Sequence, residues 1–350
     1  MAIVFAAKAE VLKEDSVPLD ADQIRHFLFM LTPNMSMIAL ASAIEPLRIA
    51  NRLSRRTLYT WKMVGERAEQ VACSNGVKLQ PDGPLEETPR DSIIFVCGGL
   101  EVSAAATKPV LTWLRRETRR GASVGSLCTG AFVLAKAGLL DGRRCTIHWE
   151  NQAALSEEFP DVEVTSHLFE ISERRYTCAG GSASADMMIQ IIANDHGSDL
   201  ASLVADHLIH SPVRASNEEQ RLSVPARIGV RHPKLVSIIQ IMEQNLEETI
   251  SPSALAKEAG MSTRQLERLF RRYLNRSPKR YYMEIRLQRA RNLLLQTDMS
   301  VINVALACGF TSPSHFSKCY RSYFDRTPYR ERGAPSSAAT SGESAVIAVK

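Results

Sequence analysis

The feature that most constrains this chain is an internal repeat in its last third. The pattern Ala-x-x-Ala-Gly-Met at residues 256–261 returns 49 residues later as Ala-x-x-Cys-Gly-Phe at residues 305–310. Residues 266–278 return 50 residues later at 316–328, and both copies end in a polar residue followed by Arg, a hydroxyl residue and Pro. Each copy predicts a helix-turn-helix, because Gly260 and Gly309 permit the positive φ that reverses the chain between two packed helices.

The second helix expected in each copy has one apolar and one polar face. Over residues 262–274 and 312–324, apolar side chains recur at i, i+3, i+4 and i+7, which buries one side of a helix. A basic, hydroxyl-bearing opposite face can contact base edges and phosphates in a major groove. The predicted DNA-binding residues are Arg264, Glu267, Arg268, Arg271, Ser314, Ser317, Lys318 and Arg321.

The charge distribution agrees with a nucleic-acid partner for this part of the chain. Residues 233–331 contain 16 Lys and Arg against 9 Asp and Glu, a net charge of +7. The remainder has 27 against 29, a net of −2. A solvated basic surface would give the same balance, so the charge supports the repeat and does not replace it.

The part before the repeat alternates strands with helices. Apolar strands are expected at 26–31, 59–64, 92–97 and 122–127, with helices at 37–51, 110–120, 129–137, 184–194 and 199–209. Strands that are apolar on both faces predict a flavodoxin-like α/β fold, a parallel sheet with helices on both faces, ahead of an all-α domain. The expected organisation is an N-terminal tail (1–25), an α/β domain (26–214), a linker (215–232), a DNA-binding domain (233–331) and a disordered tail (332–350).

Composition excludes several other classes of protein. The seven cysteines are odd in number and form no Cys-x-x-Cys pair, which argues against a disulfide framework or a zinc site. No apolar run approaches the roughly 18 residues of a membrane span, and no basic segment precedes Met1–Ala7 as in a signal peptide. We therefore expect a cytoplasmic protein with reduced thiols, no membrane association, no metal and no cofactor.

Cys128 is the candidate reactive residue of the first domain. It follows a small-residue strand and precedes a helix, the arrangement of a nucleophile elbow. At the carboxyl end of the sheet, helix amides are expected to lower its pKa, and Gly98 and Gly99 to offer backbone N–H groups nearby. The alternative is a buried thiol packed at the end of a strand.

Both parts resemble known families. Residues 233–331, above all 308–332, are similar to the DNA-binding domain of the AraC/XylS family, which implies two helix-turn-helices joined by a long helix, here 279–295. Asn275 and Asp325 stand where that family usually has Gly. Residues 26–214 resemble the sensor of GlxA-type regulators, related to PfpI/ThiJ-like proteins and class I glutamine amidotransferases. That resemblance lies in segments 43–51, 128–131, 138–143, 147–149 and 179–181 and in Asp186.

The resemblance implies a sensor without catalytic activity. Thr129 follows Cys128 where a hydrolase of this fold has His, and the loop 32–36 has no carboxylate. The predicted ligand-binding residues are Asn34, Ser36, Gly98, Gly99, Cys128, Thr129, His148 and Trp149. The segment from Glu45 to Asn51 followed by Trp61 resembles the subgroup that responds to arginine, glycine betaine or carnitine.

The predicted function is a sequence-specific transcriptional regulator, an activator, that responds to an amino acid or quaternary amine. Its partners would be promoter DNA, the small-molecule effector, a second copy of the chain in a homodimer, and RNA polymerase. The alternatives are a cysteine-dependent hydrolase or hydratase fused to a DNA-binding domain, and a constitutive DNA-binding protein whose first domain only dimerises.

Overall fold

The computed structural model describes residues 24–221, 223–297 and 299–332, so the tails expected at 1–25 and 332–350 lie almost entirely outside it. The chain divides into two compact units, and the boundary in the sequence is between Gln220 and Arg221. No helix of the described part is long and apolar enough to cross a membrane.

The first unit is built on a six-stranded sheet in the order β2-β1-β5-β6-β10-β9. These strands are β1 (Arg25–Leu31), β2 (Tyr59–Val64), β5 (Ile93–Cys97), β6 (Ser123–Leu127), β9 (Phe169–Ser172) and β10 (Arg175–Cys178). All neighbours pair in parallel except β9 with β10. Without β9 the order is that of a flavodoxin-like, doubly wound sheet, which confirms the predicted fold class.

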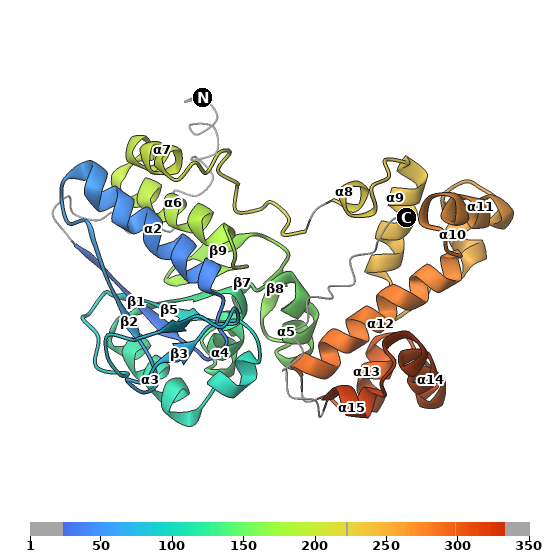
Figure 1. Ribbon diagram of the computed structural model, residues 1–350, viewed down its shortest axis with the longest axis horizontal. Coiled ribbons are helices and arrows are strands. Elements are labelled where there is room, and N and C mark those ends of the chain that lie inside the picture. The colour runs from blue at the N-terminus through green and yellow to red at the C-terminus, as the bar shows by residue number, and fades with distance from the viewer. Residues whose placement is uncertain (1–23, 222, 298, 333–350) are drawn as a thin grey trace. The chain divides into compact units, whose positions relative to one another are not determined.

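Helices cover both faces of this sheet (Figure 1). One face carries α2 (Met37–Ser54), α6 (Ala183–His196) and α7 (Ser198–His207), and the other carries α3 (Lys108–Arg120), α4 (Ala131–Lys136) and α5 (Gln152–Glu158). Because side chains alternate along a strand, Phe27 and Phe95 enter the first core while Met30 and Val96 enter the second. Each such buried side chain contributes about 1.5–3 kcal/mol relative to exposure.

Several short elements decorate the sheet. Antiparallel β3 (Val71–Ala72) and β4 (Lys78–Leu79) pair with each other, and so do parallel β7 (Arg144–Thr146) and β8 (Glu163–Thr165). Short 3₁₀ helices are η1 (Val102–Ala105), η2 (Cys128–Gly130) and η3 (Trp149–Asn151). The sequence analysis did not identify these strands, because two or three residues are too few to show a period.

The second unit is helical in its described part. Its helices are α8 (Val224–Ile228), α9 (Pro233–Gln244), α10 (Pro252–Glu258), α11 (Thr263–Leu274), α12 (Pro278–Gln296), α13 (Val301–Ala307), α14 (Pro313–Phe324) and α15 (Pro328–Arg332). The pairs α10–α11 and α13–α14 are the two helix-turn-helices, and α12 is the predicted joining helix. α8 lies within the expected linker and packs on α9, because Val224 is buried in the core of this unit.

The turns have the expected backbone. Gly260 and Gly309 have φ angles of 60° and 73°. Asn275 and Asp325, at the ends of α11 and α14, are left-handed with φ of 53° and 55°. A helix that ends in the left-handed region usually has Gly there, and Asn and Asp are the next residues to accept it.

Candidate functional site

The loops that follow β1, β5 and β6 meet at the carboxyl edge of the sheet around Cys128, and we call this group of loops the Cys128 site. The Thr129 hydroxyl donates to the Gly99 carbonyl oxygen at 2.7 Å. The Ser36 N–H donates to the Gly98 carbonyl oxygen at 3.0 Å, and Leu100 N–H donates to that of Asn34 at 3.0 Å. Neighbouring parallel strands thus bring five of the predicted ligand-binding residues close to Cys128: Asn34, Ser36, Gly98, Gly99 and Thr129.

The backbone of Cys128 is strained. Its φ of 59° is left-handed, which is uncommon for a residue other than Gly, Asn or Asp and typical of a nucleophile elbow. Gly180 packs directly against it, since a Cβ added at Gly180 would lie 2.6 Å from the Cβ of Cys128. The loop after β10 therefore packs against Cys128.

The thiol of Cys128 is not activated. Burial raises its pKa to about 11, and the Glu150 carboxylate also raises it, whereas the Thr129 N–H lowers it. The expected lowering by helix amides is therefore wrong, because desolvation of the thiolate outweighs a single amide. At neutral pH the group is a thiol.

One predicted amide donor is already engaged. The Gly98 N–H donates to the Leu127 carbonyl oxygen at 3.0 Å, as part of the pairing that continues β5 alongside β6. The expectation that Gly98 offers its N–H to a ligand is therefore wrong. A Cβ at Gly98 would lie 2.3 Å from the Gly130 nitrogen, so this position needs Gly for close packing of the two loops.

His148 and Trp149 follow β7 and lie next to Cys128. The His148 N–H contacts the Cys128 carbonyl oxygen at 3.4 Å, and the rings of His148 and Trp149 are 5.6 Å apart. Burial lowers the pKa of His148, although the Glu150 carboxylate 3.8 Å away opposes this. No hydrogen bond among the described residues joins the His148 imidazole to the Cys128 thiol.

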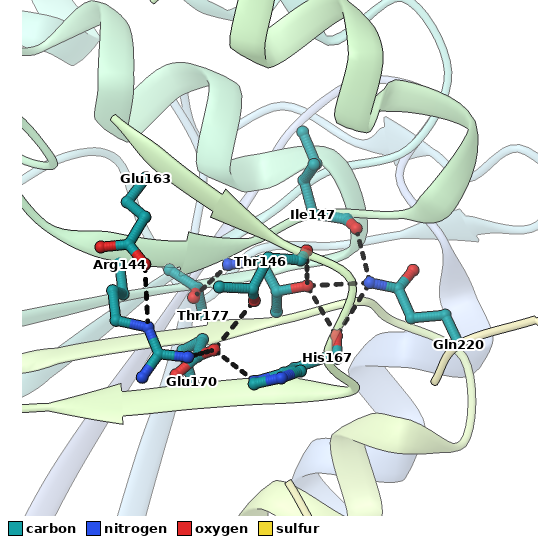
Figure 2. Close-up of polar contacts among 9 residues, drawn as sticks. Arg144, Thr146, Ile147, Glu163, His167, Glu170, Thr177 and Gln220 are labelled. Atoms are coloured by element: carbon teal, nitrogen blue, oxygen red, sulfur yellow. Dashed lines mark hydrogen bonds and ion pairs between the residues drawn. The ribbon is translucent and has the colours of Figure 1, made fainter. Parts of the chain in front are cut away.

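Gln220 anchors the segment that leaves the first unit to the ends of β7 and β8 (Figure 2). The Gln220 Nε2 lies 2.8 Å from the Thr146 hydroxyl, 2.9 Å from the Ile147 carbonyl oxygen and 2.8 Å from the His167 carbonyl oxygen. The Gln220 N–H also donates to the Ser166 carbonyl oxygen at 3.3 Å. Residues 215–220, expected to be linker, thus pack on the first unit. A single Gln in a polar stretch gives no sequence signal of this role.

Asp186 and Arg214 form a second anchor, close to the loop after β10. The Asp186 carboxylate is fully buried and accepts from Arg214 Nη2 at 2.6 Å and Nε at 3.0 Å. It also accepts from the Arg214 N–H at 2.8 Å and contacts His210 Nε2 at 2.7 Å. Arg214 further donates to Ser182, two residues after Gly180. A carboxylate on the apolar face of a predicted helix is the signal that could have identified this pair.

The predicted DNA-binding side chains occupy the outer faces of α11 and α14. Arg264, Arg268, Arg271, Ser314, Lys318 and Arg321 are exposed, while Glu267 and Ser317 are half-buried. The Ser262 hydroxyl caps α11 and Ser312 caps α14. Leu266, Phe270, Phe316 and Tyr320 bury the opposite faces. The side chains predicted to contact DNA therefore lie outside the core.

Comparison with known proteins identifies both units. The chain matches the DJ-1/PfpI family over residues 28–194 and a helix-turn-helix domain family over residues 255–334. It is 45% identical to the HTH-type transcriptional regulator GbdR of Pseudomonas aeruginosa, over 87% of this chain and 83% of GbdR. It is 39% identical to the HTH-type transcriptional regulator GlxA of Rhizobium meliloti, over 88% of this chain and 96% of GlxA. A crystal structure of an AraC family transcriptional regulator from Pseudomonas putida is 28% identical and covers 53% of this chain and 99% of its own, with a TM-score of 0.48.

Proposed function

This chain belongs to the HTH-type transcriptional regulators that join a DJ-1/PfpI domain to an AraC-type helix-turn-helix domain, and on that premise we propose that its first unit is a non-catalytic sensor whose ligand binds at the Cys128 site. The protein is a DNA-binding regulator of transcription. The proposal concerns what controls it and which residues do so.

One observation carries the proposal: the segment leading to the DNA-binding unit is hydrogen-bonded next to two loops of the Cys128 site. Gln220 bonds to the Ile147 carbonyl oxygen, next to His148. Arg214 bonds to Ser182 and Asp186, next to the Gly180 loop that covers Cys128. A ligand that binds more tightly to one arrangement of these loops changes the fraction of molecules in which the linker is anchored. Such a difference in affinity is what control by a ligand requires.

The effector class that we propose is a small amino acid or quaternary amine. Its carboxylate would bind at the carboxyl edge of the sheet, near Gly99 and Thr129. Its cationic group would face Trp149, which is 37% exposed beside His148, whereas Trp61 packs against the core.

A thermal-shift screen tests this assignment. The probes are arginine, glycine betaine and carnitine, with 3,3-dimethylbutanoate as a matched control that keeps the shape and carboxylate of glycine betaine but has no cation. A ligand at about 100 times its dissociation constant should stabilise the unit by roughly 2.7 kcal/mol. Stabilisation by the control equal to that by glycine betaine would contradict the role of Trp149.

Absence of turnover is also part of the proposal, supported by the raised pKa of Cys128. We expect Cys128→Ser to retain induction of its promoter, with effector affinity changed only a few-fold, because one hydrogen bond contributes about 0.5–1.5 kcal/mol. The measurement is a reporter assay combined with effector binding. Loss of induction with folding and DNA binding intact would favour the cysteine-dependent enzyme instead.

We further propose that the regulator is a cytoplasmic homodimer that activates transcription by RNA polymerase. Ile38 and Leu100, next in the sequence to loops of the Cys128 site, are exposed apolar side chains that a second copy would cover, and they support association through the first unit. Sedimentation of the intact protein tests the dimer, and Ile38→Glu should shift it toward monomer. Transcription in vitro with purified RNA polymerase distinguishes activation from repression.

A further inference from the structure

A pocket of about 260 Å³ opens on the second unit between α9, the α10–α11 turn and one side of α11. We name it the α9–α11 pocket. Three cations, Lys234, Arg268 and Arg272, line it together with His232, and no carboxylate is among its lining residues.

The three cations are available to an anion. The Lys234 Nζ donates to the Gly260 carbonyl oxygen at 3.3 Å, and Arg272 lies over the Tyr273 ring at 5.4 Å. No ion pair within the described ranges involves any of the three. A concave site lined by one sign of charge concentrates the field and attracts counter-ions, so an anion is the ligand that this pocket favours.

The internal repeat provides a comparison within the same unit. In the second copy Arg286, on α12, donates to the Cys308 carbonyl oxygen at 2.7 Å, beside the turn glycine, and lies 4.1 Å from the centre of the Phe310 ring. Ser322 stands where the first copy has Arg272. The first copy therefore carries a cation at this position of its second helix that the repeat itself does not require.

The position of the pocket on α11 indicates which anion binds. Successive residues of a helix are 100° apart, so Gln265 and Arg272 lie about a quarter turn from the face formed by Arg264 and Arg271. A recognition helix in the major groove has a phosphate backbone on either side, and phosphate contacts fix its register. Arg268 lies between the two faces and borders both.

We propose that the α9–α11 pocket binds a backbone phosphate of duplex DNA, held by Lys234 and Arg272, beside the bases that α11 reads. The proposal rests on the prediction that α11 enters the major groove. It assigns to the first helix-turn-helix a sequence-independent anchor that the second lacks.

The test measures the salt dependence of DNA binding by the full chain. Fluorescence anisotropy is recorded between about 50 and 200 mM salt on two duplexes, a random sequence and the chain's own upstream region. Lys234→Ala and Arg272→Ala should each reduce the slope of log K against log salt by about 0.9 and weaken both duplexes by the same factor. Arg272→Lys keeps the charge and should keep the slope.

Two further variants make the result unambiguous. Arg330→Ala, on α15, removes an exposed charge outside the pocket and should leave the slope unchanged. Arg264→Ala tests the groove itself: a loss confined to the upstream duplex supports α11 as the reading helix, whatever the pocket variants do. An unchanged slope in Lys234→Ala and Arg272→Ala, or a loss confined to the upstream duplex, overturns the phosphate pocket.

A free phosphate compound is the other source of the same chemistry. Inorganic phosphate exchanged for chloride at constant ionic strength should not change the calorimetric unfolding of the second unit. Stabilisation by phosphate that disappears in Lys234→Ala would assign the pocket to a free anion and overturn its role on DNA.

Discussion

Replacing Arg214 by alanine removes the cation that neutralises a fully buried carboxylate. The Arg214 guanidinium donates twice to one oxygen of Asp186, at 2.6 and 3.0 Å. The other oxygen keeps the main-chain N–H of residue 214 at 2.8 Å and His210 at 2.7 Å. In the variant Asp186 therefore stays buried, with hydrogen-bond partners for only one of its two oxygens and without the arginine side chain.

The magnitude follows from these contacts. Removing one partner of a buried ion pair typically costs about 3–5 kcal/mol. Because Arg214 is itself 32% exposed and two donors remain, we expect about 2–3 kcal/mol. For a unit of this size that is a fall in Tm of about 4–12 °C.

Tryptophan fluorescence measures this loss selectively. All three tryptophans, at positions 61, 113 and 149, belong to the first unit, so urea unfolding followed by their emission reports on that unit alone. Arg214→Ala in an Asp186→Asn background should cost less than about 1 kcal/mol, since no buried charge is then left unpaired. A loss below about 0.5 kcal/mol in the single variant, or equal losses in the two backgrounds, would refute the reasoning.

Three further outcomes are expected. Arg264→Ala should weaken binding to the chain's own upstream duplex by about 1–3 kcal/mol and leave random DNA little affected, as measured by competition. Burial alone would raise the pKa of Glu117, but hydrogen bonds from Thr88 and Arg116 lower it on balance from its ordinary value of 4.5. The ionised Glu117 carboxylate therefore stabilises the first unit above about pH 4.5, and this stabilisation is lost as pH falls through the lowered pKa. Glu117→Gln should make the urea midpoint less dependent on pH in this range. Gly260→Ala should cost about 1–2 kcal/mol for its left-handed backbone, and Gly309→Ala about 1–3 kcal/mol more, because its Cβ would lie 2.5 Å from the Glu247 carbonyl oxygen. Circular dichroism of the helical unit that showed equal losses for both glycines would contradict the close approach at Gly309.

Local backbone conformation was predictable from the sequence. The positive φ angles at Gly260 and Gly309, the left-handed ends at Asn275 and Asp325, and the parallel sheet all depend on a few neighbouring residues or on a simple period. The elbow at Cys128 belongs to the same group, since a strand, a small-residue turn and a helix follow one another directly in the chain.

Only the tertiary structure decided the environments of these residues. Gly260 and Gly309 are equivalent in sequence, yet one faces open space and the other a backbone carbonyl. The pKa of Cys128 rises because segments distant in the chain bury its thiol. Gln220 contacts Ile147 across 73 residues of sequence. Desolvation and long-range hydrogen bonds depend on which surfaces meet after the chain has folded, and no local pattern of residues encodes that.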